Sequence, residues 1–296
     1  MRKEIIQVIN AEKIFSTSTG MFKPKTNTKA LNQVNLTIYE GETLGVVGES
    51  GSGKTTLGRC IVGLENLTSG DIKYQDVVLN NKTQSQINEK MQIIFQDPYS
   101  ALNPTRTALA SVMEPLLVKM NREAAKATAL KMLALVGIDA EAANKLPRAF
   151  SGGQRQRIGI ARAVATKPTF ILCDEPTSAL DVSIQRQVLD LLKELQQKMK
   201  LTYLFISHDL SVVRFVSDRI AVMYKGHLVE LGPAESVFEN PAHTYTKRLL
   251  ESAPLTDPKE ARAQMSQTTS SEIDITLSEE CDWIAVGMDH FVRKCR

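Results

Sequence analysis

The segment GESGSGKT, residues 48–55, has the composition of a loop that binds phosphate groups. Its spacing, G-x4-G-K-T, puts the second glycine directly before Lys54 and Thr55. Glycines let the backbone curl so that successive amide hydrogens converge on an anion, and the N-terminus of the following helix adds positive potential. Lys54 would reach the β- and γ-phosphates of a nucleotide, and the Thr55 hydroxyl could bind Mg²⁺. The alternative is a glycine-rich turn that contains Lys-Thr by chance, but the apolar strand before it and the helical segment after it favour a phosphate loop.

Two adjacent carboxylates, Asp174 and Glu175, follow the apolar run FILC. Because the carboxyl end of a parallel strand faces the ligand crevice, Asp174 is placed to orient Mg²⁺, directly or through water. Glu175 would then face the γ-phosphate as the candidate general base for a water molecule. Two carboxylates at a strand end are often only surface charges, but a phosphate loop in the same chain favours the functional interpretation.

A second possible anion site lies in FSGGQRQRIGIARAV, where Ser151, Gly152 and Gly153 come directly before a helix with three arginines. Small residues at a helix N-terminus can bind an anion. The alternative is a serine N-cap followed by a solvated basic helix face, and this alternative would be preferred if the motif stood alone. Two anion sites in one chain suggest that each serves a nucleotide shared between two copies or homologous partners.

The elements that must position these residues follow from the hydrophobic pattern. The first third contains short strands, EIIQVI, LNQVNLTIYE, ETLGVVG and DIKYQDVVL, with a polar loop at residues 16–29. Residues 104–136 have apolar positions at helical spacing. Strands and helices then alternate through TFILCD, SIQRQVLDLLKELQQKMK, TYLFIS, DLSVVRFV and RIAVMY, which predicts βαβ units with a largely parallel, buried sheet. After a polar stretch at residues 253–280, CDWIAVGMDHFVRKCR predicts a small strand or hairpin.

Composition disfavours several classes of protein. The chain has 296 residues, 43% of them hydrophobic, and a net charge of +3, so it lacks the electrostatic footprint of a dedicated nucleic-acid binder. It has no apolar run near the roughly 20 residues that cross a bilayer, and the start MRKEIIQVIN does not resemble a signal peptide, so we expect it in the cytoplasm. The four cysteines form no CxxC pair, so reduced thiols are expected in place of a disulfide framework or a zinc site: Cys60, Cys173, Cys281 and Cys295.

These motifs resemble those of the ATP-binding subunits of ABC transporters over about residues 3–254. GESGSGKT resembles the Walker A motif, FILCDE the Walker B motif, and SGGQ (residues 151–154) the signature loop. SALD (residues 178–181) resembles the D-loop. Gln96 in IIFQDP matches the Q-loop glutamine, and His208 in FISHDL matches the switch histidine, although a lone His or Gln is usually structural or solvated.

The resemblance implies a head-to-tail dimer in which ATP lies between Walker A of one subunit and the signature loop of the other. Water would attack the γ-phosphate with Glu175 as base, His208 would contact that phosphate, and Gln96 would sense Mg²⁺ or water while linking to a membrane partner. Phe15 best matches the aromatic that stacks on adenine, and is otherwise a core residue. The implied nucleotide-binding residues are Phe15, Gly48, Glu49, Ser50, Gly51, Ser52, Gly53, Lys54, Thr55, Thr56, Ser151, Gly152, Gly153 and Gln154. The implied metal-binding residues are Thr55, Gln96 and Asp174.

Three longer segments, YEGETLGVVGESGSGKTTLGR, MQIIFQDPYSALNP and ENPAHTYTKRLL, resemble the oligopeptide and dipeptide importer ATPases. TTLGR and FQDPYSALNP are similar to the F subunit of the two paired ATPases. The resemblance implies a heterodimer with a sister ATPase, two membrane permease subunits and an extracytoplasmic substrate-binding protein, with the chain peripheral on the cytoplasmic face of the inner or plasma membrane. Members of the group transport di- and oligopeptides, nickel, glutathione or cationic antimicrobial peptides, and their selectivity resides in other subunits.

The implied fold is an α/β P-loop NTPase with a RecA-like core, an antiparallel β subdomain mainly from the first 90 residues and an α-helical signature subdomain at about residues 100–160. Residues 1–254 would form the nucleotide-binding domain, and residues 255–296 a linker and a short accessory tail. Many relatives carry four tail cysteines, proposed to hold an iron–sulfur centre. The tail of this chain has only Cys281 and Cys295, so no such cluster is expected.

Two other classes of function fit less well. A soluble ABC ATPase that acts on ribosomes or DNA typically carries two ATPase halves or a long coiled-coil insert, and the sequence contains neither. A non-hydrolysing regulatory subunit would have a degenerate site, whereas Lys54, Asp174, Glu175, Ser151 and His208 are intact.

Overall fold

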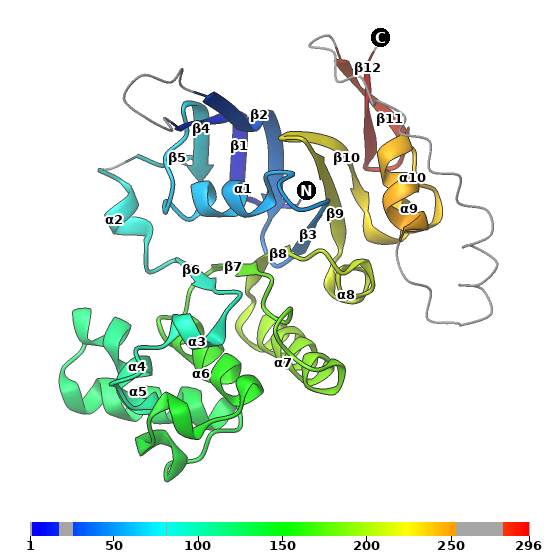
Figure 1. Ribbon diagram of the computed structural model, residues 1–296. Helices are drawn as coiled ribbons and strands as arrows, with labels where there is room; N and C mark the ends of the chain where they lie inside the picture. Colours follow the sequence, from blue (N-terminus) through cyan, green and yellow to red (C-terminus); the bar gives the residue numbers. More distant parts are fainter. Residues whose placement is uncertain (1, 18–25, 81, 253–280, 296) are drawn as a thin grey trace.

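The structure is a computed structural model that describes residues 2–17, 26–80, 82–252 and 281–295 (Figure 1). A four-stranded antiparallel sheet forms from the first part of the chain, in the order β2-β1-β4-β5. Its strands are β1 (Glu4–Thr17), β2 (Thr26–Tyr39), β4 (Ser69–Tyr74) and β5 (Val77–Val78). Because β2 pairs with β1 as far as Thr17, the predicted loop at residues 16–29 is wrong at both ends, and its residues 18–25 lie outside the described residues.

The second sheet has eight strands in the order β11-β12-β10-β9-β3-β8-β7-β6. Its strands are β3 (Thr43–Val47), β6 (Met91–Ile94), β7 (Phe170–Asp174), β8 (Thr202–Ile206), β9 (Arg219–Tyr224), β10 (His227–Pro233), β11 (Cys281–Gly287) and β12 (His290–Cys295). The five strands from β9 to β6 are parallel, as predicted, and the three others are antiparallel. Every residue of β3, β7 and β8 is buried, which explains their continuous apolar sequences.

Side chains of the parallel strands alternate between two hydrophobic cores. Phe170 and Leu172 belong to the core that also contains β1, β2 and α1, whereas Ile171 and Cys173 belong to the core that contains α7, α8 and the helices after Pro98. Since successive side chains of a strand point to opposite faces, the sheet lies between the two cores. The carboxyl ends of its parallel strands are thereby fixed from both sides.

Ten α-helices and three 3₁₀ helices occur in the described residues. They are α1 (Lys54–Ile61), α2 (Gln84–Ile87), α3 (Pro98–Ala101), α4 (Ala108–Met113), η1 (Glu114–Val118), α5 (Arg122–Leu135), η2 (Ala142–Asn144), η3 (Pro147–Ala149), α6 (Gly152–Ala165), α7 (Val182–Met199), α8 (Leu210–Val216), α9 (Ala234–Glu239) and α10 (Thr244–Glu251). In the part of the chain described, no helix has the length and apolar character that a membrane span requires.

The helices from α3 to α6 form a separate lobe, the helical lobe, drawn in green in Figure 1. The predicted helical segment at residues 104–136 is confirmed as helical, but it is broken into α4, η1 and α5. Pro115 in η1 has no N–H group to continue a helix, and the Asn121 side chain accepts a hydrogen bond from the Ala124 amide (2.9 Å), which starts α5.

The end of the chain forms the hairpin of β11 and β12, as the alternating pattern predicted, and β12 pairs with β10. Cys281 lies opposite Cys295 in this hairpin, and Cys281 is disulfide-bonded. The expectation that all four cysteines are reduced thiols is therefore wrong for Cys281, because hairpin pairing brings residues distant in sequence into register. Cys60 and Cys173 are buried free thiols, and burial raises the pKa of Cys60 to about 11.

Candidate active site

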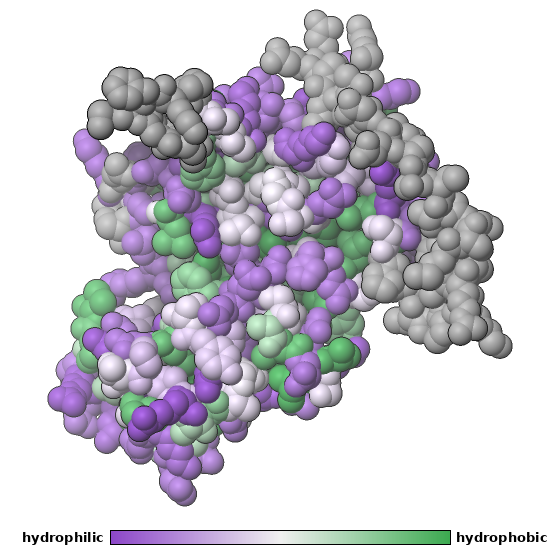
Figure 2. Space-filling model, in the orientation of Figure 1, coloured by the Kyte–Doolittle hydropathy of each residue, from purple (hydrophilic) through white to green (hydrophobic). Residues whose placement is uncertain are grey.

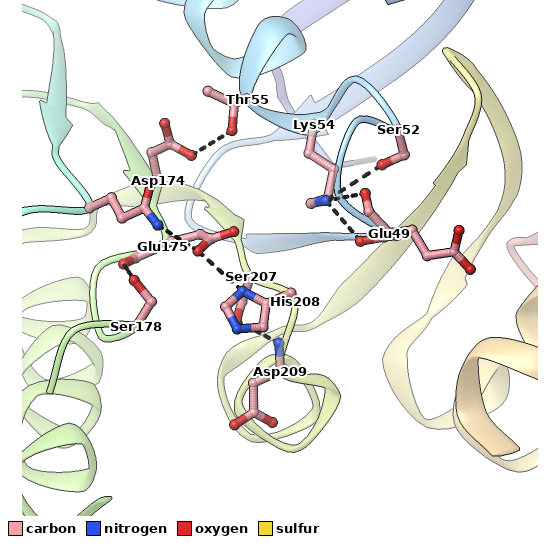
Figure 3. Close-up of polar contacts among 12 residues, drawn as sticks. Glu49, Ser52, Lys54, Thr55, Asp174, Glu175, Ser178, Ser207, His208 and Asp209 are labelled. Carbon is pink, nitrogen blue, oxygen red and sulfur yellow. Dashed lines mark hydrogen bonds and ion pairs between the residues drawn. The ribbon is translucent and has the colours of Figure 1, made fainter. Parts of the chain in front are cut away.

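The phosphate loop connects the end of β3 to the start of α1 (Figure 3). Gly48 has φ +148°, and a Cβ there would lie 2.2 Å from the Met223 carbonyl oxygen. Gly53 has φ +105°, and a Cβ there would lie 2.3 Å from the Ala30 carbonyl oxygen. Both positions therefore require glycine, since the backbone curls and also touches a neighbouring strand. Between them, the Ser52 amide donates a hydrogen bond to the Glu49 carbonyl oxygen (3.2 Å).

Lys54 begins α1, and its side chain folds back over the loop. Lys54 Nζ lies 2.8 Å from the carbonyl oxygens of Gly48 and Glu49 and donates hydrogen bonds to both. Burial lowers the pKa of Lys54, and the nearby carboxylates of Glu175, Asp174 and Glu49 oppose this shift. The positive charge of Lys54 is thus held beside the loop amides, where it would attract a phosphate group.

Thr55 and Asp174 bring oxygen ligands together from two elements. Thr55 is the second residue of α1, Asp174 is the last residue of β7, and Thr55 Oγ1 donates a hydrogen bond to Asp174 Oδ1 (3.1 Å; Figure 3). Burial raises the pKa of Asp174, while the hydrogen bond from Thr55 lowers it. A hydroxyl and a carboxylate are the hard oxygen donors that Mg²⁺ prefers, so this pair fits that ion. The described residues contain no cluster of three or more His, Cys, Asp and Glu side chains for a metal held by protein alone.

Glu175, Gln96 and His208 meet beside this pair, each just past the carboxyl end of a parallel strand. Gln96 Nε2 donates a hydrogen bond to Glu175 Oε2 (3.0 Å), and His208 Nδ1 lies 3.1 Å from the same oxygen. Glu175 has φ +47°, and its backbone is fixed by its amide bond to the Ile206 carbonyl (2.9 Å) and by Ser178 Oγ on its carbonyl (3.1 Å). An uncommon backbone conformation that is held from two sides thus fixes the direction in which the Glu175 side chain leaves the backbone, towards Gln96 and His208.

The segment at residues 151–154 forms a capped helix start in the helical lobe. Ser151 Oγ accepts a hydrogen bond from the Gln154 amide (3.3 Å), and Gln154 Oε1 accepts one from the Ser151 amide (3.0 Å). A Cβ at Gly153 would lie 2.4 Å from Ile184 of α7, so glycine permits close packing of α6 and α7. In Figure 1 the start of α6 lies in the lower lobe, away from the loop before α1. One chain does not bring residues 151–154 to Lys54.

The arginines of α6 do not form the solvated basic face of the alternative interpretation. Arg155 is buried and its Nε donates a hydrogen bond to the Pro147 carbonyl (2.7 Å). The two others donate from Nη1 to backbone carbonyls, Arg157 to Val136 (3.1 Å) and Arg162 to Ala101 (2.6 Å). The serine N-cap of that interpretation is confirmed, but its basic face is wrong, because these side chains satisfy backbone carbonyls at helix ends of the helical lobe.

Phe15 lies on β1, opposite Thr28 of β2. Its side chain is 37% exposed, which does not fit the alternative of a core aromatic, and Lys13 Nζ lies 4.8 Å from the centre of its ring. Two residues after Thr28, the Ala30 carbonyl touches Gly53, so this end of β2 borders the phosphate loop. An exposed ring near the loop is suited to stack on a planar base.

Comparisons with known proteins identify the family. A model of the ABC transporter family matches residues 31–178, and a model of the oligopeptide/dipeptide transporter C-terminal region matches residues 229–283. The oligopeptide transport ATP-binding protein OppF of Bacillus subtilis is 45% identical over 99% of this chain and 96% of its own length. The chain belongs to the ABC transporter ATP-binding family. The dipeptide transport ATP-binding protein DppF of Lactococcus lactis is also similar to this ABC subunit, with 44% identity over 98% of the chain and 94% of that protein.

A solved structure shares the fold of this ABC subunit. It is a dimeric ATP-binding cassette in a post-hydrolysis state bound to ADP and Pi, with TM-score 0.69 and 32% identity over 78% of this chain and 99% of that one. The predicted fold class, a P-loop NTPase with antiparallel β and α-helical subdomains, is confirmed. This ABC subunit is an ATPase that binds nucleotide, and the resemblance to the F subunits of oligopeptide and dipeptide importers is confirmed.

Sequence reasoning missed the residues that hold His208 in this ABC subunit. The Asp209 amide donates a hydrogen bond to Ser207 Oγ (3.0 Å; Figure 3). Asp209 Oδ1 caps α8 by accepting from the amides of Ser211 (2.9 Å) and Val212 (3.3 Å). The backbone at His208 is therefore fixed between a strand end and a helix cap. An aspartate directly before the apolar segment LSVV is a helix-start signal that could have revealed this.

Proposed function

We propose that the chain is the ATP-hydrolysing subunit that powers an importer of di- and oligopeptides. The observation that carries the proposal is the Glu175 carboxylate, which Gln96 and His208 hold beside a complete phosphate loop. The similarity of nearly the whole chain to oligopeptide and dipeptide transport ATP-binding proteins supports the peptide class of substrate.

Nucleotide binding falls to the phosphate loop, with Phe15 stacking on the adenine ring. The amides from Ser50 to Thr55 would enclose the phosphates, and Lys54 Nζ would exchange its bonds to the loop carbonyls for bonds to phosphate oxygens. The residues proposed for this role in one chain are Phe15, Gly48, Glu49, Ser50, Gly51, Ser52, Gly53, Lys54, Thr55 and Thr56.

Thr55, Asp174 and Gln96 would hold Mg²⁺, directly or through water. When bound, the ion would neutralise negative charge that develops on the phosphate groups during transfer. Asp174 supplies the carboxylate and also accepts the Thr55 hydroxyl bond, which fixes both oxygens before any ligand arrives.

Glu175 is the proposed general base. Its carboxylate would accept a proton from the attacking water, and general-base assistance contributes about 10²–10⁴-fold to a rate. Gln96 and His208 contact Oε2 and would orient the carboxylate, and the His208 side chain, which is 62% exposed, can also turn to the γ-phosphate. In this proposal Gln96 and His208 orient the Glu175 carboxylate, and Glu175 accepts one proton.

The second half of the nucleotide site would come from another ATPase subunit. Because residues 151–154 lie in the helical lobe, away from the loop before α1, Ser151, Gly152, Gly153 and Gln154 can reach nucleotide only across a head-to-tail dimer. The related cassette described as dimeric and bound to ADP and Pi supports such an arrangement. We propose a heterodimer with a sister ATPase, in line with the similarity to F subunits.

A membrane partner would dock on the helical lobe. Gln96 is followed by Tyr99, which is 65% exposed, and Leu117 and Val118 of the same lobe are 49% and 77% exposed. Figure 2 shows apolar residues at several places on this otherwise polar lobe. These side chains suit contacts with two permease subunits, which would hold the chain at the cytoplasmic face of the inner or plasma membrane, opposite a substrate-binding protein.

We retain the proposed division into a nucleotide-binding domain at residues 1–254, with its helical part at about 100–160, and a linker with an accessory tail at 255–296. Helix α10 ends at Glu251, close to the proposed boundary. The hairpin β11–β12 nevertheless joins the central sheet, so the tail would contribute to the same folded unit.

The test is ATP hydrolysis by the isolated chain and by the chain assembled with its sister ATPase and permeases, with Lys54→Ala as the inactive reference. Strong stimulation by the partners, together with ATP-dependent uptake of a labelled oligopeptide, is the expected result. Rapid turnover that is indifferent to the partners would overturn the transport role. Uptake of nickel, glutathione or antimicrobial peptides in place of oligopeptides would overturn the substrate class alone.

A further inference from the structure

The phosphate loop forms a hydrogen bond with a residue that lies far from it in the sequence. Tyr245, the second residue of α10, is buried, and its hydroxyl oxygen accepts a hydrogen bond from the Glu49 amide (2.9 Å) across 196 residues of sequence. The carbonyl of the same residue, Glu49, accepts from Lys54 Nζ (2.8 Å). Tyr245 therefore acts on the residue that carries one of the contacts of the phosphate-binding lysine.

The ring of Tyr245 is fixed by its surroundings. It packs on the ring of Tyr224 with 4.3 Å between centroids, and its own amide donates a hydrogen bond to His243 Nδ1 (3.1 Å), which caps α10. Burial raises the pKa of Tyr245 to about 12, so the hydroxyl stays neutral. The packing of the ring therefore fixes the position of a neutral hydroxyl oxygen that accepts the Glu49 amide hydrogen bond.

A buried carboxylate connects this support to the terminal hairpin. Glu230 of β10 is 0% exposed, and its oxygens accept hydrogen bonds from the amides of Ala242 (2.8 Å) and His243 (2.9 Å). His290 Nε2 of β12 lies 2.7 Å from Glu230 Oε1 and completes the set. A Cβ at Gly232 would lie 2.7 Å from the His290 ring, so the backbone of β10 packs directly against this ring.

The other side of the loop has its own external contact. The amide of Gly226, in the turn between β9 and β10, donates a hydrogen bond to the Ser52 carbonyl (3.0 Å). The loop is thus held at Glu49 and at Ser52 by residues that β10 and its neighbours position. Loss of the Tyr245 contact would remove one of the two restraints on the Gly48–Glu49 peptide, whose carbonyl oxygen accepts from Lys54 Nζ (2.8 Å), while the strand and helix that flank the loop remain in place.

We propose that Tyr245 is a positioning residue for ATP binding, and that Glu230 and His290 hold it against the phosphate loop. The inference rests on the proposed role of the loop in binding nucleotide. By binding the Glu49 amide from outside, Tyr245 keeps this N–H out of the phosphate-binding concavity and keeps the Glu49 carbonyl aimed at Lys54. The segment HTYT and the terminal hairpin, which the hydrolytic mechanism does not use, thereby gain a function at the active site.

The test compares Tyr245→Phe with the matched control Tyr224→Phe in the full chain, because each removes one hydroxyl from the same ring pair. We measure the equilibrium Kd of a slowly hydrolysed ATP analogue, the KM and kcat of ATP hydrolysis, and the thermal midpoint without nucleotide. Loss of one neutral hydrogen bond predicts a three- to tenfold rise in Kd and KM for Tyr245→Phe, with kcat within twofold of the wild-type value. Tyr224→Phe is expected to bind as the wild-type chain does.

His290→Ala provides a second variant that is remote from the loop. It is expected to weaken nucleotide binding as well, and the double variant with Tyr245→Phe should bind less weakly than the product of the two effects predicts, because both act on the same contact. Unchanged Kd in Tyr245→Phe, equal losses in Tyr224→Phe, or full additivity in the double variant would overturn the inference. If Tyr245→Phe does not fold, unchanged binding in His290→Ala overturns it. A wild-type chain that binds no better than Lys54→Ala would overturn the proposed function itself.

Discussion

Replacement of Glu175 by glutamine should abolish turnover and leave ATP binding intact. The amide has nearly the shape of the carboxylate, and its oxygen can still accept from Gln96 Nε2, which lies 3.0 Å from Oε2 in the wild-type chain. It cannot accept a proton from water, so the rate should fall by about 10²–10⁴, equivalent to about 3–5 kcal/mol of transition-state stabilisation. Removal of one negative charge near Lys54 also removes repulsion of the phosphates, so the Kd for ATP should stay equal or decrease.

The assay is phosphate release in a single turnover, with ATP binding measured on the same samples. Glu40→Gln is the matched control, because Glu40 forms an exposed ion pair with Lys3 (2.9 Å) away from the phosphate loop. This variant should hydrolyse ATP at the wild-type rate. A fall of less than tenfold in Glu175→Gln, with ATP bound at saturation, would show that another group accepts the proton. Weaker ATP binding would show that the carboxylate serves mainly to hold the site together.

Three further changes test the surroundings of the site. Gly53→Ala puts a Cβ 2.3 Å from the Ala30 carbonyl at φ +105°, so urea unfolding should show a loss of roughly 3 kcal/mol; an unchanged value would refute the requirement for glycine. Thr55→Val removes the hydroxyl beside Asp174, so half-maximal hydrolysis should require about tenfold more Mg²⁺, and an unchanged Mg²⁺ titration would contradict the proposed ligand. Burial lowers the pKa of His227 to about 4, so its contribution to stability is complete above about pH 6.5 and is lost as the pH falls towards 4. His227→Asn should therefore remove about 2 kcal/mol of the fall in unfolding free energy between pH 7 and 5, and equal pH dependence in both chains would refute the shift.

The parts of the site that the sequence predicted are those with short-range causes. The phosphate loop requires glycines at fixed spacing because its backbone curls at Gly48 and touches a neighbouring strand at Gly53. Asp174 and Glu175 were predictable because a buried apolar strand must end where polar residues resume, and parallel strands end at the crevice. The alternation of strands and helices predicted the parallel sheet for the same reason.

The remaining features depend on contacts between distant segments. The solvated basic face that was the alternative for α6 is wrong because a helical pattern does not reveal that the carbonyls of Pro147, Val136 and Ala101 accept hydrogen bonds from its arginines. Periodicity likewise gave no information on how far β1 extends, since β2 determines this by pairing with it. Tyr245 was part of a segment used only for its resemblance to relatives, because nothing local connects a helix near residue 245 to an amide at residue 49.

The hydrogen bond between Glu49 and Tyr245 can form only late in synthesis, because the two residues lie far apart in the sequence. Their separation of 196 residues corresponds to roughly 10–40 s of translation at about 5–20 residues per second, and His290 follows later still. During this interval a nascent chain already contains the whole phosphate loop but lacks the groups that support it from behind. A chain truncated before α10 would carry every nucleotide-binding motif and still leave the Glu49 amide to water, so an intact set of motifs is not a measure of a finished active site.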